Sequence, residues 1–139
     1  MTRQANPAPP ALPPLVLSKE DYHRLSSLAT AAQRHLPDAA ARLSDEIERA
    51  ELRASVPSDV VTMNALVRFR DETTGIEREI RLVYPPDADI ASGRVSILTP
   101  IGTALIGLAE GGSIDWTTPE RGTRRFTVLA VTRKRLDAS

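Results

Sequence analysis

Hydrophobic residues in the first third of the chain recur at helical spacing. The pattern predicts one helix over residues 18–33, with an apolar face of Tyr22, Leu25, Leu28, Ala29 and Ala32. A second helix is predicted to start at Pro37 and to extend to residue 54, with an apolar face of Ala40, Leu43, Ile47, Ala50 and Ala54. These positions alternate in steps of three and four, which is typical of a coiled-coil seam. We therefore expect a short antiparallel helical hairpin with its tip at residues 31–38.

Alternating hydrophobic and polar residues follow in the rest of the chain and predict β-strands. Strands over residues 66–70 and 78–84 flank a turn and form a β-hairpin. Further strands are expected over residues 94–98, 113–117 and 126–131, with a turn at residues 119–122. The expected fold class is α+β, with four to five mostly antiparallel strands and one short helix on a face of the sheet.

That short helix is predicted directly after the strand over residues 94–98. Thr99 can cap its N-terminus, and Pro100 fits the first helical position, where its missing N–H costs nothing. Ile101, Ala104 and Leu105 follow at helical spacing and supply an apolar face that can cover a sheet.

Composition narrows the function classes. The 139 residues contain no cysteine, which excludes disulfides and thiolate metal sites. No apolar run reaches the roughly 20 residues that span a bilayer, and the N-terminus lacks the apolar core of a signal peptide, so a cytoplasmic protein is expected. The formal net charge of zero argues against a free-standing nucleic-acid binder.

The predicted organisation has four parts. Residues 1–14 are rich in proline and are expected to be a disordered tail, although such a segment could also serve a proline-reading domain. Residues 15–57 form the helical hairpin, residues 58–132 form the β-domain, and residues 133–139 form a basic flexible tail.

Four motifs of the second half carry a family resemblance. They are Val60-Val61-Thr62-Met63-Asn64-Ala65, Val67-Arg68-Phe69-Arg70-Asp71, Leu82-Val83-Tyr84-Pro85 and Thr99-Pro100-Ile101-Gly102. On these motifs the chain resembles the regulator of nucleoside diphosphate kinase (Rnk) family, a relative of the GreA and GreB transcript cleavage factors. The resemblance implies an FK506-binding-protein-like β-domain behind a short coiled coil.

The resemblance also implies a partner, RNA polymerase. In Gre factors the β-domain docks at the mouth of the secondary channel. By position, the contacts here would involve Thr99, Pro100, Ile101 and Gly102, with Asp89 nearby. The alternative is that Pro100 and Gly102 only shape the junction between strand and helix while Ile101 packs in the core.

The hairpin tip distinguishes two functions within this resemblance. Gre factors hold a catalytic magnesium ion with acidic tip residues, because Mg²⁺ prefers oxygen ligands. Here the tip contains Arg34, His35 and a single carboxylate, Asp38. We therefore expect a non-catalytic factor that competes with cleavage factors, is not an enzyme, and uses no metal, cofactor or small-molecule substrate. The alternative is a Gre-type factor that stimulates transcript cleavage.

Two further alternatives are less favoured by composition. A peptidyl-prolyl isomerase needs an aromatic-lined pocket, which two Phe, two Tyr and one Trp are expected to build only with difficulty. A weak contact with nucleic acid or an acidic polymerase surface would have to use the basic cluster of Arg121, Arg124, Arg125, Arg133, Lys134 and Arg135.

Overall fold

A computed structural model describes residues 15–118 and 122–132 of the chain. The first elements are β1 (Val16–Ser18), α1 (Lys19–Ala32), α2 (Pro37–Glu48) and β2 (Glu51–Arg53). β1 and β2 pair in parallel and join the two ends of the helical hairpin. The predicted tails at residues 1–14 and 133–139, and most of the turn at residues 119–122, lie outside the described residues.

Local capping explains where the two helices begin. The Ser18 hydroxyl accepts a hydrogen bond of 3.0 Å from the backbone N–H of Asp21 at the start of α1. Pro37 is the first residue of α2, a position that needs no N–H donor. The predicted hairpin is therefore confirmed, and its apolar residues Leu25, Leu43 and Ile47 are buried.

The predicted C-terminal end of the second helix is wrong. α2 ends at Glu48 and not at residue 54, so Ala50 and Ala54 lie outside it. The backbone N–H of Glu51 instead donates to the carbonyl of Leu15 at 2.8 Å, and the next residues pair with β1. A strand partner supplied by a distant segment thus replaces the last predicted turn of helix.

Five strands form one mixed sheet. They are β3 (Leu66–Asp71), β4 (Glu77–Val83), β5 (Arg94–Ser96), β6 (Ser113–Thr118) and β7 (Gly122–Thr132), in the order β5-β4-β3-β7-β6. Neighbours are antiparallel except β4 and β5, which two short 3₁₀ segments, η2 (Pro85–Asp87) and η3 (Ile90–Ser92), connect. The predicted α+β fold class with a mostly antiparallel sheet is confirmed.

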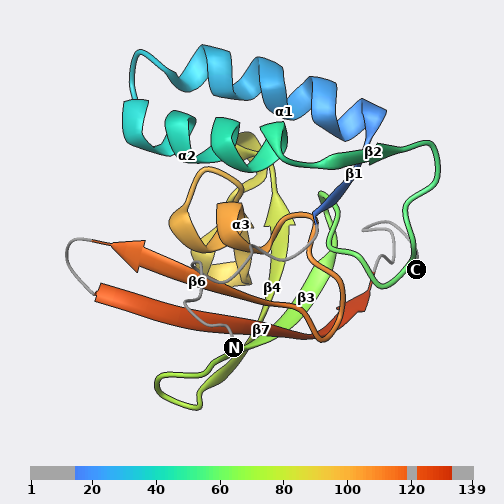
Figure 1. Cartoon of the computed structure of the whole chain (residues 1–139). Coiled ribbons are helices and arrows are strands. Elements are labelled where there is room, and N and C mark those ends of the chain that lie inside the picture. Colours follow the sequence, from blue (N-terminus) through green and yellow to red (C-terminus); the bar gives the residue numbers. More distant parts are fainter. Residues whose placement is uncertain (1–14, 119–121, 133–139) are drawn as a thin grey trace, which may run out of the picture.

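The short helix α3 (Pro100–Leu105) lies between the hairpin and the sheet (Figure 1). Fully buried residues from the hairpin, such as Leu25 and Leu43, belong to the same hydrophobic core as Leu82, Leu105 and Val128 of the β-domain. The hairpin is therefore packed onto the β-domain through residues such as Leu25, Leu43 and Ile47, while its tip is exposed. None of the described helices is long and apolar enough to cross a membrane.

Candidate functional site

The loop at residues 99–102, here called the docking loop, is shaped by one side chain. The Thr99 hydroxyl accepts a hydrogen bond of 3.1 Å from the N–H of Gly102 and donates one of 2.7 Å to the carbonyl of Ser96. Thr99 is thus the N-cap of α3, and Pro100 occupies its first turn, as predicted. These contacts hold the loop in a fixed shape at the end of β5.

The four loop residues have different surroundings. Gly102 is buried, and a Cβ atom at this position would lie only 2.4 Å from the carbonyl oxygen of Ser96. Gly102 therefore lets α3 approach β5 and is not accessible to a partner. Pro100 is exposed and Ile101 is half-buried, so these two residues are the ones that another molecule could touch.

Asp89 lies outside this arrangement. Its carboxylate accepts a hydrogen bond of 2.8 Å from the Ser92 hydroxyl and pairs with Arg94 at 3.6 Å. Its backbone also exchanges hydrogen bonds with Arg94. The contacts described for Asp89 are with this turn and not with the docking loop, and its part in a docking surface stays a prediction.

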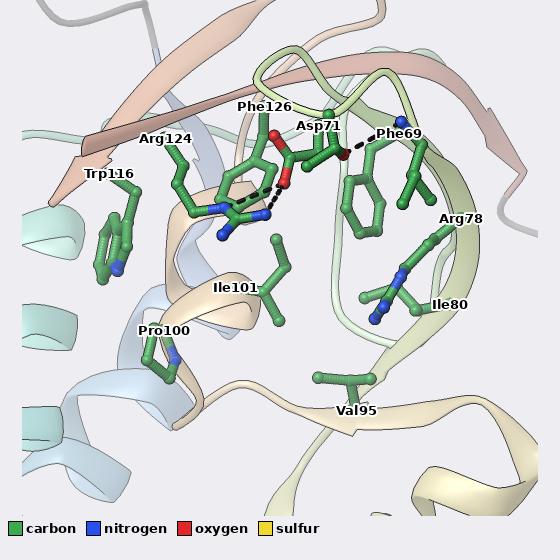
Figure 2. A pocket seen from close by; sticks show the side chains of 12 residues that line it. Phe69, Asp71, Arg78, Ile80, Val95, Pro100, Ile101, Trp116, Arg124 and Phe126 are labelled. Atoms are coloured by element: carbon green, nitrogen blue, oxygen red, sulfur yellow. Dashed lines mark hydrogen bonds and ion pairs between the residues drawn. The ribbon is translucent and has the colours of Figure 1, made fainter. Parts of the chain in front are cut away.

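A pocket of about 590 Å³ opens beside the docking loop (Figure 2). We call it the aromatic pocket, because both phenylalanines and the only tryptophan of the chain line it. Pro100 and Ile101 form part of its wall, and the full lining consists of Phe69, Asp71, Thr74, Ile76, Arg78, Ile80, Val95, Pro100, Ile101, Trp116, Arg124 and Phe126. The expectation that so few aromatic residues could hardly build such a pocket is wrong.

Strand alternation gathers these side chains on one face of the sheet. Phe69 and Asp71 are two residues apart on β3, as are Arg124 and Phe126 on β7. The rings of Phe69 and Phe126 meet edge to face, with centroids 5.8 Å apart. Period-two spacing was present in the sequence, but the order of the strands was needed to show that these positions meet.

Polar groups of the pocket are unequally satisfied. Asp71 accepts hydrogen bonds from the Arg124 guanidinium, one of them 2.9 Å long from Nε, and one of 2.9 Å from the backbone N–H of Thr73. Burial raises the pKa of the Asp71 carboxyl, but these hydrogen bonds outweigh it and the net pKa is lowered. Within the described part of the chain, no ion pair or hydrogen bond engages the Arg78 side chain.

Such a pocket is suited to binding. Its wall is largely apolar, its one carboxylate is occupied by Arg124, and Arg78 is exposed at its rim. None of its lining residues is a serine, histidine, cysteine or lysine that could act as a nucleophile or base.

The hairpin tip is exposed and poor in acids. Arg34, His35 and Asp38 are all exposed, as is the apolar Leu36, whose exposed fraction is 49%. Among the residues that the structure describes, no three acidic or histidine side chains form a group that could hold a metal ion. Leu36 was not predicted as a site residue, although an apolar residue in a polar turn was visible in the sequence.

Two residues of the basic cluster, Arg124 and Arg125, are held in ion pairs with carboxylates of the sheet. Arg124 is bound to Asp71, and Arg125 donates to Asp115 at 2.7 Å. Hydrogen bonding with Asp115 raises the pKa of the Arg125 guanidinium, and the same contact lowers the pKa of the Asp115 carboxyl. The other members of the cluster, Arg121 and residues 133–135, lie outside the described residues.

Two aromatic contacts tie the hairpin to the β-domain. The Arg24 guanidinium of α1 lies 4.7 Å from the ring centre of Tyr84, and Arg42 of α2 lies 5.9 Å from that of Trp116. Burial, with a smaller effect of the Asp21 carboxylate, raises the pKa of Tyr84 to about 12. Trp116 of β6 also lines the aromatic pocket, so one side chain contacts both Arg42 of α2 and the pocket.

Comparison with known proteins agrees with this architecture. Residues 13–52 match the family "Rnk N-terminus", and residues 56–133 match "Transcription elongation factor, GreA/GreB, C-term". The chain is 37% identical over 110 residues to the regulator of nucleoside diphosphate kinase of Escherichia coli K12, which covers 77% of this chain and 80% of that protein.

Two further relatives are described as elongation factors. Transcription elongation factor GreA of Azorhizobium caulinodans is 34% identical over 113 residues, covering 80% of this chain and 69% of the relative. The solved structure of a GreA/GreB elongation factor from Nitrosomonas europaea superimposes with a TM-score of 0.67 at 38% identity, covering 85% of this chain and 98% of that one. The predicted resemblance is confirmed: the chain belongs to the Rnk and GreA/GreB family, with an Rnk N-terminus followed by a GreA/GreB C-terminal domain.

Proposed function

We propose that this protein binds RNA polymerase near its secondary channel, presents a short non-catalytic hairpin there, and competes with transcript cleavage factors. The observation that carries the proposal is the pairing of a GreA/GreB-type β-domain with a tip that has one carboxylate. The β-domain supplies the docking surface, and the tip lacks the ligands that cleavage would need.

Pro100, Ile101 and the aromatic pocket support the docking surface. Pro100 is exposed beside a preformed apolar pocket, and the Thr99 cap holds it in place. A rigid exposed apolar residue next to a pocket loses little conformational freedom when a partner covers it. In this proposal Pro100 and Ile101 make contacts, whereas Thr99 and Gly102 position them and Asp89 acts separately or not at all.

The tip supports the non-catalytic part of the proposal. Mg²⁺ prefers oxygen ligands, but Asp38 is the only carboxylate among tip residues 31–38, where Arg34 adds a positive charge instead. The hairpin is also short, with helices of 14 and 12 residues. The protein would therefore occupy the channel entrance without recruiting a metal ion, and it would not act as an enzyme.

Binding to purified core RNA polymerase, with a Gre factor as competitor, tests this proposal. We expect saturable binding, mutual displacement, and inhibition of Gre-stimulated transcript cleavage. Ile101→Asp should weaken binding at least tenfold, because a charge would enter an apolar wall. Leu52→Asp, at an exposed position of β2 outside the pocket lining, should not.

Two results would contradict the proposal in different ways. Absence of polymerase binding at micromolar concentrations would remove the docking function. Stimulation of cleavage in a backtracked complex without any Gre factor would support the alternative, a Gre-type cleavage factor, and would require a metal site that involves more than Asp38.

A further inference from the structure

The aromatic pocket has an apolar wall and one unmatched charge. Phe69, Trp116 and Phe126 from the sheet, together with Pro100 and Ile101, supply much of its surface. A volume of about 590 Å³ exceeds what one side chain fills and lies within the usual range for ligand pockets. The pocket can therefore accept a segment with more than one apolar side chain.

Arg78 lies at the rim of this pocket, across it from Trp116 (Figure 2). Its neighbour Glu77 is on the opposite face of β4 and pairs with Arg68 at 3.0 Å and Arg70 at 3.6 Å. Asp71, the one carboxylate of the pocket lining, is instead paired with Arg124 and accepts from the N–H of Thr73. In residues 15–118 and 122–132, no carboxylate lies within ion-pair distance of Arg78.

We infer that the aromatic pocket receives an apolar segment of the polymerase that also carries a carboxylate, and that Arg78 pairs with this carboxylate at the rim. This inference rests on the proposed function and assigns the chemistry of its docking partner. An arginine can bind a carboxylate through two parallel hydrogen bonds, which also fixes the orientation of the partner. Arg78 would thus determine which apolar segment is accepted.

The chain's own N-terminal segment is a poorer occupant. Residues 1–14 are rich in proline and alanine, but they contain no aspartate or glutamate and carry an arginine, Arg3. The apolar residues of that segment could occupy the pocket, but they would supply no carboxylate for Arg78. Charge complementarity therefore favours an acidic partner.

The first experiment measures the affinity of the full-length protein for core RNA polymerase at low and moderate salt. We expect Arg78→Gln to weaken binding about tenfold and to reduce its salt dependence, and Arg78→Glu to weaken it further. Arg68→Gln is the matched control, because it removes the same charge from the opposite face of the neighbouring strand, and it should change affinity less than twofold. If Arg78→Gln and Arg68→Gln bind equally well while wild type competes with a Gre factor, the inference is overturned and the proposed function stands.

The second experiment does not require polymerase. Trp116 is the only tryptophan of the chain and lines the pocket, so its fluorescence reports occupancy by tryptophan-free peptides. We compare a short peptide of two leucines followed by glutamate with its twin in which lysine replaces the glutamate. The glutamate peptide should bind about tenfold more tightly, and Arg78→Gln should remove this difference.

Two results of the peptide experiment would overturn the inference even if wild type failed to bind polymerase. One is equal affinity of the glutamate and lysine peptides. The other is tighter binding of a peptide with the sequence of residues 1–14, which would assign the pocket to the chain's own N-terminal segment.

Discussion

At the scale of single residues, the Thr99 hydroxyl makes both hydrogen bonds that shape the docking loop. Thr99→Ala should lower the free energy of unfolding by about 1–2 kcal/mol, because α3 loses its N-cap and the Ser96 carbonyl loses a donor. Thr99→Ser keeps the oxygen and should stay within about 0.5 kcal/mol of wild type. Urea unfolding of the three proteins measures the difference, and an equal loss in both variants would show that the threonine methyl group, not the cap, matters.

Asp71 gives the protein a defined dependence on pH. The folded pKa of its carboxyl is lowered, so the resulting stability is present above the ordinary pKa of aspartate, about 3.9, and is lost as the pH falls through the lowered value. Asp71→Asn should cost about 1–3 kcal/mol at neutral pH, because the half-buried Arg124 partner loses its anion. It should also flatten the acidic side of the curve of stability against pH.

Asp115→Asn is the control for Asp71. Asp115 also pairs with an arginine and also has a lowered pKa, but its side chain is 41% exposed, against 11% for Asp71. Exposed pairs contribute little, so this variant should lose less than about 1 kcal/mol. Chemical unfolding between pH 3 and 8 compares them, and similar curves for both variants would contradict the importance of burial.

Thr99 and Asp71 show which single-residue contacts could be predicted from the sequence and which could not. The Thr99 cap was predictable, since its acceptor and donor lie within three residues. The Asp71–Arg124 pair joins residues 53 positions apart and depends on the pairing of β3 with β7. No local pattern indicates it, and the sequence prediction placed Arg124 in a basic surface cluster instead.

At the scale of elements, the hairpin depends on the sheet beneath it. Leu43 of α2 is fully buried in the core that the hairpin shares with the β-domain, while Leu36 at the tip is 49% exposed. Leu43→Ala should cost about 2–5 kcal/mol and Leu36→Ala close to none, although both remove the same atoms. Thermal unfolding followed by circular dichroism measures both losses.

The same unfolding curves test whether the hairpin and the sheet unfold as one unit. We expect helix and sheet signals to be lost together in Leu43→Ala, because one core supports both. Separate melting of the helical signal at a lower temperature would show that the hairpin unfolds independently and would contradict this packing.

The ends of helices could be predicted from the sequence only where a nearby residue, such as a capping residue or a proline, sets them. Ser18 and Pro37 mark the helix starts that the structure shows. Residues 51–53 have no local signal against helix, yet they form β2 because β1 offers them parallel pairing. A partner more than 30 residues away therefore overrides their helical preference.

At the scale of the whole molecule, the overall charge bears on whether the protein binds nucleic acid by itself. The formal net charge is zero, and Arg124 and Arg125 are held in ion pairs within the sheet. We expect no binding to a short DNA duplex in the absence of polymerase, even at low ionic strength. Fluorescence polarisation of a labelled duplex measures this, and a salt-dependent rise at micromolar protein would contradict it.

Helix spacing, strand alternation, capping residues and the motifs around residues 60–102 were sufficient to specify the α+β class, the hairpin, the short helix and the family. All of these depend on residues close together in the chain. Strand order, the end of α2, the shared core and the aromatic pocket depend on contacts between distant segments. Phe69, Arg78 and Trp116 belong to three different strands, and only the folded sheet brings them to one pocket, because strand order is set by pairing between segments far apart in the sequence.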